Sequence, residues 1–217
     1  MKFLNVLFLA TMAMAAPKME ARQQQTVSGT VISAITNLES STRTNVRTIE
    51  EALQTIRQST EVTIIVQLEG TLRANYRAIL SAIQVATRDI VSVTTGSAGG
   101  LAGSVRGLTQ QEVDNLTQSV YTLITALSNI RAVLTVTVTD LRPSTQQLIA
   151  SEVNAIRSVL EPFLNPVVAY YNTVRNFGAS VGLEITGLNG VLQSLYSTVN
   201  SLTSSLGLPS IPGTNGA

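Results

Sequence analysis

The amino-acid sequence predicts an all-α fold, a bundle of four to six long amphipathic helices. Aliphatic residues recur at steps of three and four, or at sums of these steps, through most of residues 26–206. The positions opposite these stripes are rich in Ser, Thr, Gln and Asn. Consecutive helices of this kind, joined by short links, are typical of an up-down bundle. Only 4% of the residues are aromatic, so the core must consist mainly of Val, Ile and Leu.

The first helical segment covers residues 26–69. Several of its apolar residues are 11 positions apart, such as Leu38 and Ile49, and this period keeps an apolar stripe straight along a helix. The sequence EVTIIVQLEG at its end is rich in β-branched residues, so a strand is an alternative there. Gly70 is expected to break the pattern, and a second helical segment continues over residues 71–95.

Residues 94–107 contain five glycines and form the clearest predicted loop. A phosphate-binding loop is an alternative reading of this segment. However, the segment lacks the lysine of the G-x-x-x-x-G-K-[ST] pattern and follows no clear strand, so we expect no nucleotide site. Thr109 and Glu112 then form a capping box, which predicts the start of a helix.

This third helix is expected to continue to Leu141. The alternating sequence LTVTVTD (134–140) near its end leaves a strand as an alternative. Pro143 forces a break, and Ser144 is expected to cap the next helix.

Two prolines, Pro162 and Pro166, should kink that fourth helix or split it in two. Residues 176–190 contain four glycines and are expected to be loose. A last helix is predicted at about 188–206, followed by a disordered tail over residues 207–217.

The N-terminal 15 residues have the features of a signal peptide. Lys2 supplies the positive charge, an apolar run follows, and Ala13-Met14-Ala15 matches a signal-peptidase site. The apolar run of about 10 residues is too short to span a bilayer, which takes about 20 helical residues. We therefore expect a secreted protein, with residues 16–25 as a flexible leader before the helical domain of residues 26–206. We expect no lipid anchor at the C-terminal sequence GLPSIPGTNGA, which is not a hydrophobic tail.

The composition excludes most catalytic chemistry. The chain has no His and no Cys, so it cannot form a Ser-His-Asp triad, a Cys nucleophile or the usual zinc or iron–sulfur sites. We expect no enzyme activity, no cofactor and no metal. The formal net charge is +1, and it becomes zero when Lys2 is removed with the signal peptide, which leaves 13 basic and 13 acidic residues. Neither value indicates a nucleic-acid partner.

The helix faces are the feature that points to a function. Charged residues make up only 12% of the chain, whereas Ser and Thr make up 48 of 217 residues. An aliphatic face opposite a hydroxyl-rich face can bind an apolar surface by burial alone, with little dependence on salt. The predicted partners are a hydrophobic surface, or a lipid or fatty acid. The alternative is that the stripes form only the core. The candidate contact residues are Leu72, Tyr76, Ile79, Ile83, Val120, Leu123, Ile124, Leu127, Phe163 and Tyr171.

Four smaller groups of polar residues have two readings each. Arg73 and Arg77 lie one turn apart and can grip the carboxylate of a lipid headgroup, or form surface salt bridges with Glu69 or Asp89. Tyr170 and Tyr171 line a pocket mouth or belong to the core. Asn115 begins a glycosylation sequon but falls inside a predicted helix. The acidic residues of the first segment can pair as acid and base, but a solvated face is the favoured reading; these residues are Glu50, Glu51, Glu61 and Glu69.

The chain resembles the secreted fungal hydrophobic surface-binding proteins and the related cell-wall galactomannoproteins. The resemblance rests on the leader ending near AAPKMEARQ, the Ser/Thr-rich aliphatic helices and the segment GLTQQEVDNLTQSVYTLITALSNI (107–130), and it covers most of residues 26–175. It implies an extracellular, non-enzymatic protein that adsorbs to hydrophobic solids or holds lipids in a helical cavity, and that can recruit hydrolases to the coated surface. The alternative functions are a self-associating structural protein of the cell wall and a membrane-active effector.

Overall fold

The computed structural model describes residues 26–139 and 143–214, and it confirms the all-α bundle. The described ranges contain helices and no strands. The helices are α1 (Val27–Gln58), α2 (Val62–Gly96), α3 (Gly100–Gly103), α4 (Gln110–Thr139), α5 (Pro143–Ser180) and α6 (Thr186–Leu206). The predicted signal peptide and leader lie outside the described residues.

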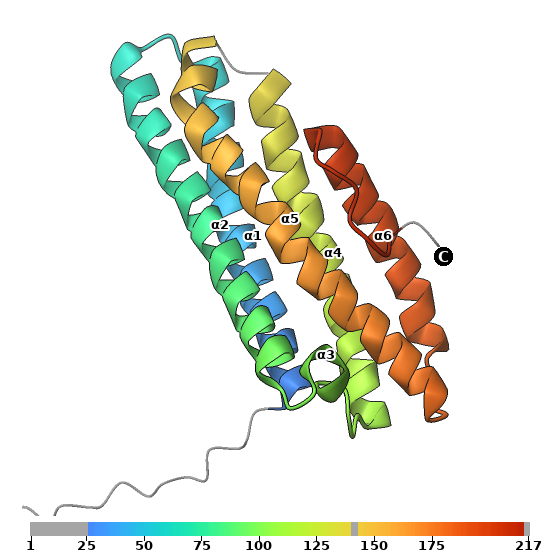
Figure 1. Ribbon diagram of the computed structural model, residues 1–217. Coiled ribbons are helices and arrows are strands. Elements are labelled where there is room, and N and C mark those ends of the chain that lie inside the picture. The colour runs from blue at the N-terminus through green and yellow to red at the C-terminus, as the bar shows by residue number, and fades with distance from the viewer. Residues whose placement is uncertain (1–25, 140–142, 215–217) are drawn as a thin grey trace, which may run out of the picture.

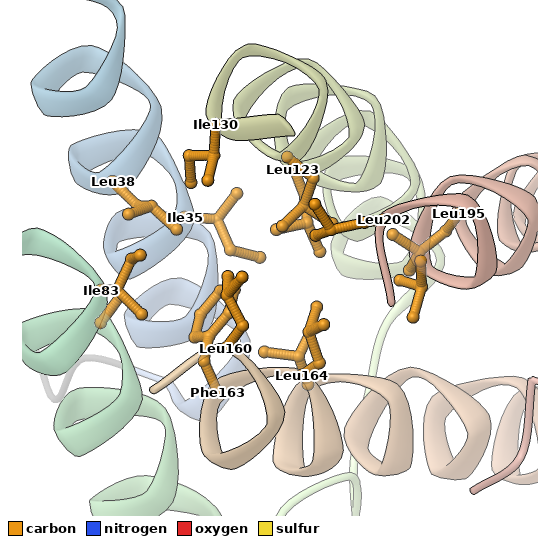
Figure 2. Packing of buried hydrophobic residues seen from close by; sticks show 14 of the residues in the cluster. Ile35, Leu38, Ile83, Leu123, Ile130, Leu160, Phe163, Leu164, Leu195 and Leu202 are labelled. Carbon is orange, nitrogen blue, oxygen red and sulfur yellow. The ribbon is translucent and has the colours of Figure 1, made fainter. Parts of the chain in front are cut away.

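Five long helices enclose a single core. α1 packs against α2 and α4, α2 packs against α5, and α4 packs against α6. α5 crosses the bundle diagonally (Figure 1); it packs mainly against α2 and also contacts α4 and α6. Aliphatic side chains from all five helices converge at the centre, as Ile35, Ile83, Leu123, Leu164 and Leu195 show (Figure 2).

The predicted break at Gly70 is wrong. The helix α2 runs through Gly70 without interruption, and the turn between α1 and α2 lies at residues 59–61 instead. Gly70 is exposed, and a glycine within a helix costs only about 1 kcal/mol relative to alanine. The buried side chains of Ile65 and Leu72 on either side of it hold the helix against the core and outweigh this cost.

The two strand alternatives are also excluded by the structure. The segment EVTIIVQLEG belongs to α2 from Val62 onward, and the described part of LTVTVTD belongs to the end of α4. Tertiary packing of an amphipathic stripe overrides a local β preference in both places.

The predicted capping box at the start of α4 is confirmed. The backbone N–H of Glu112 donates to Thr109 Oγ1 over 3.3 Å, and the backbone N–H of Thr109 donates to Glu112 Oε2 over 3.0 Å. The predicted loop ahead of it is shorter than residues 94–107, because α2 extends to Gly96 and α3 forms one turn within it. Gly103 is required there, since a Cβ atom would lie 1.9 Å from the carbonyl oxygen of Ala98.

The prolines do not divide the fourth long helix. α5 begins at Pro143, so Ser144 lies inside its first turn and is not the cap that we expected. Pro162 and Pro166 both lie within the continuous helix. Phe163 and Val167, which follow the two prolines directly, are fully buried, so packing holds the helix together where backbone hydrogen bonds are lost. The predicted loose stretch shrinks to residues 181–185 between α5 and α6.

The disordered tail predicted from residue 207 is wrong for the part that the structure describes. Residues 207–214, which we call the strap, turn back after α6 and pack on the bundle (Figure 1). Gly207 makes the reversal possible with a φ of 66°, in the left-handed region that glycine favours. Ile211 is completely buried in the core, which supplies the burial that holds this segment in place.

Candidate functional site

The residues predicted to contact a surface or a lipid lie inside the closed bundle. Ile124 is partly buried, and the other nine are at most 1% exposed: Leu72, Tyr76, Ile79, Ile83, Val120, Leu123, Leu127, Phe163 and Tyr171. They all belong to the continuous core, or in the case of Ile124 pack against it. The closed bundle therefore does not present them to a partner, and they can contact one only if the helices separate.

The two adjacent tyrosines also belong to the core and do not line a pocket mouth. Both are fully buried, and their rings meet edge to face with centroids 5.8 Å apart. The Tyr171 hydroxyl hydrogen-bonds the Ser119 hydroxyl over 2.7 Å and so ties α5 to α4. The Tyr170 hydroxyl has no hydrogen-bond partner among the described residues. Burial raises the pKa of both hydroxyls, so both remain protonated across the physiological range.

Arg73 and Arg77 bind a carboxylate, but it is the side chain of Glu152 in the same chain and not a ligand. Arg73 Nε lies 3.0 Å and Arg77 Nη2 lies 2.9 Å from Oε1 of Glu152 on α5. Glu152 is only 5% exposed, and Ser151 donates a further hydrogen bond to its Oε2. The predicted partners Glu69 and Asp89 do not form these bridges; Glu69 instead accepts a hydrogen bond from the Thr145 hydroxyl over 2.8 Å.

These contacts decide the charge state of Glu152. Burial alone would raise the pKa of its carboxyl group. The hydrogen bonds from Ser151 and Arg73, together with the positive charge of Arg73, outweigh burial and lower the pKa to about 2. The cluster therefore acts as a charged clamp between α2 and α5. A lipid headgroup would have to compete with Glu152 for the two arginines, so the closed bundle offers no ready headgroup site at this position.

A second carboxylate links α1 to α4. The Ser28 hydroxyl donates to Glu112 Oε1 over 2.5 Å, while Glu112 also takes part in the capping box with Thr109. Burial raises the pKa of Glu112, but the hydrogen bonds from Ser28 and Thr109 outweigh it and lower the pKa overall. This contact fixes the start of α1 beside the start of α4.

Hollows on the surface are open grooves between neighbouring helices. A groove of about 360 Å³ runs between α1 and α2, and one of about 520 Å³ runs between α4 and α6. A third, of about 280 Å³, lies between α2 and α5, with walls that include Val91, Val159 and Pro162 and with Arg88 among its lining residues. Ser, Thr and Ala predominate in the lining of the first two grooves, and each groove also has a charged residue, Asp89 in the first and Arg131 in the second.

An exposed apolar pair lies at the start of α2. Val62 is 73% exposed and Val66 is 60% exposed, and they are one helical turn apart. We call this pair the tip valines. Sequence reasoning treated this segment as a possible strand and missed the pair. The sequence does indicate such a pair. The run Val62–Val66 has apolar residues at four of its five positions, and a helix can turn only some of these toward the core, so the others must be exposed.

The remaining predicted polar sites are at the surface. Glu50, Glu51 and Glu61 are exposed, as expected of a solvated face, and Glu51 pairs with Arg47 on the same helix. Asn115 lies on an exposed position of α4. The side chains described provide no group of three or more acidic residues that could hold a metal ion.

No helix within residues 26–139 or 143–214 combines the length and apolar character that a membrane span requires. In comparisons with known proteins, no family model matches the chain, and no curated protein or solved structure is significantly similar to it. The resemblance to fungal hydrophobic surface-binding proteins therefore stays a prediction.

Proposed function

We propose that this chain is a secreted, non-enzymatic protein that binds hydrophobic surfaces or lipid-like ligands through its aliphatic helix faces. The observation that carries the proposal is the exposed pair of tip valines at one end of an otherwise hydroxyl-rich bundle. Side chains this exposed bury little area in the closed bundle, and they offer a first point of contact for an apolar surface.

The composition supports binding without electrostatic attraction. Interfacial helices usually use Lys and Arg to approach anionic lipids. This chain has only two lysines, Lys2 and Lys18, both ahead of the helical domain, and its 12 arginines are balanced by 13 acidic residues, so no excess of basic charge attracts anionic lipids. Apolar burial is the remaining driving force, at about 25 cal/mol per Å².

After first contact, the buried aliphatic faces can also bind the surface, because the free energy gained there can offset the cost of separating the helices. A helix that places a few hundred Å² of aliphatic surface on a solid gains about 5–10 kcal/mol before ordering costs. The stability of a typical domain is about 5–15 kcal/mol. A surface that takes up several helix faces can therefore offset the cost of separating the helices, whereas the bundle stays closed in water.

Depletion by beads tests this proposal. The protein starting at residue 16 is mixed with hydrophobic beads and with hydrophilic beads of equal area, and the protein left in solution is measured. We expect selective loss to the hydrophobic beads. The double variant Val62→Ser/Val66→Ser should adsorb several-fold more slowly, because it lacks the tip valines. The matched control Val85→Ser/Val181→Ser removes two exposed valines elsewhere and should adsorb like the unaltered protein.

Three outcomes would argue against the proposal. Equal recovery from both kinds of bead would mean that the aliphatic stripes serve only as core. Concentration-dependent oligomers without preference for apolar beads would favour the self-associating structural protein. Dye leakage from liposomes at the concentrations used for binding would favour the membrane-active effector.

A further inference from the structure

The seam between α4 and α6 carries a single positive charge. The two helices lie side by side and run in the same direction (Figure 1), and a Cβ atom on Gly187 of α6 would lie 3.9 Å from Thr117 Cγ2 of α4. α6 contains no charged residue, and α4 contains none after Asp114 except Arg131. Arg131 is exposed, and its guanidinium group forms no ion pair or hydrogen bond with any described residue. No acidic side chain of these two helices therefore competes with an anionic ligand for it.

The groove of about 520 Å³ along this seam is lined by hydroxyl groups that are free to bind a ligand. Several threonines of α4 donate to the backbone of their own helix, as Thr125 does over 3.1 Å. In contrast, Ser128, Ser197 and Ser201 line the groove and make no side-chain hydrogen bond within the part of the chain that the structure describes. Each hydroxyl can donate one hydrogen bond and accept others, so the groove matches a ligand that itself has many hydroxyls.

An exposed aromatic ring lies on the same side of α4, ahead of the groove. Tyr121 is 53% exposed, whereas the other aromatic side chains that the structure describes are buried or partly buried. It comes one turn after Thr117, which lies beside α6, and about two turns before Ser128, which lines the groove. Tyr121 therefore lies along the seam as well. A tyrosine ring is apolar on its faces and polar at its hydroxyl, and so it can stack on the C–H face of a sugar ring.

We propose that the seam between α4 and α6 binds an acidic carbohydrate chain, a polyuronate, along the line from Tyr121 to Arg131. One sugar ring stacks on Tyr121, the serine hydroxyls of the groove bind sugar hydroxyls, and the Arg131 guanidinium group binds a uronate carboxylate through two parallel hydrogen bonds. The path from Tyr121 to Thr135 along α4 is about 21 Å, at about 1.5 Å per residue, which leaves room for several sugar rings.

This site is a second binding activity that does not depend on the proposed function. The seam is on the outside of the closed bundle, so a ligand can bind there without separation of the helices. An alkyl chain would leave the hydroxyls and the charge of the groove without partners, whereas a uronate chain supplies a partner for each kind of group.

Binding of a fluorescently labelled oligogalacturonate, measured by fluorescence anisotropy, tests the site. The sample is the protein starting at residue 16, which contains all of the described helices. Arg131→Gln should weaken binding on the order of tenfold, because it removes the charge-assisted pair with the carboxylate. The matched control Arg88→Gln removes an exposed arginine of α2 and should change the affinity by less than about twofold, since solvent screens a charge outside the site.

Two substitutions of Tyr121 test the stacking contact. Tyr121→Ser removes the ring and should weaken binding several-fold, whereas Tyr121→Phe keeps the ring and should bind like the unaltered protein. The side chain is exposed, so both variants should fold, and circular dichroism checks this.

Several outcomes would overturn the proposal. They are absence of probe binding by the unaltered protein, equal effects of Arg131→Gln and Arg88→Gln, and equal affinity for a labelled neutral maltooligosaccharide. Binding of a polyglutamate peptide as tight as that of the probe would instead assign the seam to an acidic protein partner. Hydrophobic beads keep this test separate from the proposed function. Arg131→Gln should lose probe binding and still adsorb like the unaltered protein, and probe binding should weaken between low ionic strength and about 150 mM salt.

Discussion

The clamp around Glu152 predicts how the bundle responds to loss of one buried charge. The substitution Glu152→Gln keeps the shape of the side chain but removes the charge that Arg73 and Arg77 bind. The pKa of Glu152 falls from 4.5 to about 2 in the folded protein. At about 1.4 kcal/mol per tenfold change in the protonation equilibrium, a lowering of this size corresponds to a few kcal/mol at most.

Solvent reduces this figure. The side chains of Arg73 and Arg77 remain 40% and 63% exposed, so water and salt screen part of the interaction. We therefore expect Glu152→Gln to lower the free energy of unfolding by about 1–3 kcal/mol at pH 7. The control is Glu51→Gln, which removes an exposed pair with Arg47 and should cost less than about 0.5 kcal/mol.

The contribution of Glu152 to the free energy of unfolding should decrease as the pH falls. The folded-state pKa of Glu152 is lower than its ordinary value, so its contribution is present above about pH 4.5 and is lost as the pH falls toward 2. Urea denaturation followed by circular dichroism, at several pH values between 7 and 2.5, measures this directly. The difference between the unaltered protein and Glu152→Gln should shrink as the pH falls. A difference that stays constant down to pH 2.5, or a Glu51→Gln cost equal to that of Glu152→Gln, would refute the reasoning.

Two further predictions concern the core and the helix α2. Tyr170→Phe removes a buried hydroxyl that has no partner in the described part of the chain, and it should leave stability unchanged or raise it by up to about 1 kcal/mol. Tyr171→Phe breaks the bond to Ser119 and should cost about 1 kcal/mol. Thermal unfolding of the two variants side by side checks this, and the reverse order would contradict it. Gly70→Ala should stabilise the protein by about 0.5–1 kcal/mol, because the position is helical and, apart from the adjoining backbone of α2, no atom of the described residues lies within 4 Å of the added Cβ. A loss of stability in urea denaturation would show that Gly70 has a role that the structure does not explain.

The helices could be predicted from the sequence because their signals are local. The steps of three and four between apolar residues indicated each long helix, and the capping box at Thr109 located the start of α4. Helix ends were less certain. Gly70 and Pro162 carry local signals for a break, but the packing of neighbouring residues overrides both signals. The turn between α1 and α2 lies at residues 59–61, where the sequence has no signal for a helix break as strong as Gly70.

The contacts between distant parts of the chain could not be predicted. The spacing of Arg73 and Arg77 correctly indicated that they can hold a carboxylate, but the partner is Glu152, 79 positions from Arg73. Ile211 lies in a sequence rich in Gly, Pro and Ser, which is typical of a disordered tail, and only the fold shows that it fills the core. The aliphatic stripes likewise cannot distinguish a core from a binding face, because both require the same residues.

The dependence of adsorption on salt tests the central claim most directly. The protein starting at residue 16 is depleted by hydrophobic beads at low ionic strength and again at about 150 mM salt, where charges more than about 8 Å apart are largely screened. The account predicts equal and selective loss to hydrophobic beads under both conditions, because the attraction comes from apolar burial in a chain with 13 basic and 13 acidic residues. Loss of adsorption at about 150 mM salt would contradict the account, since it would show that charge, and not the aliphatic faces, holds the protein on the surface.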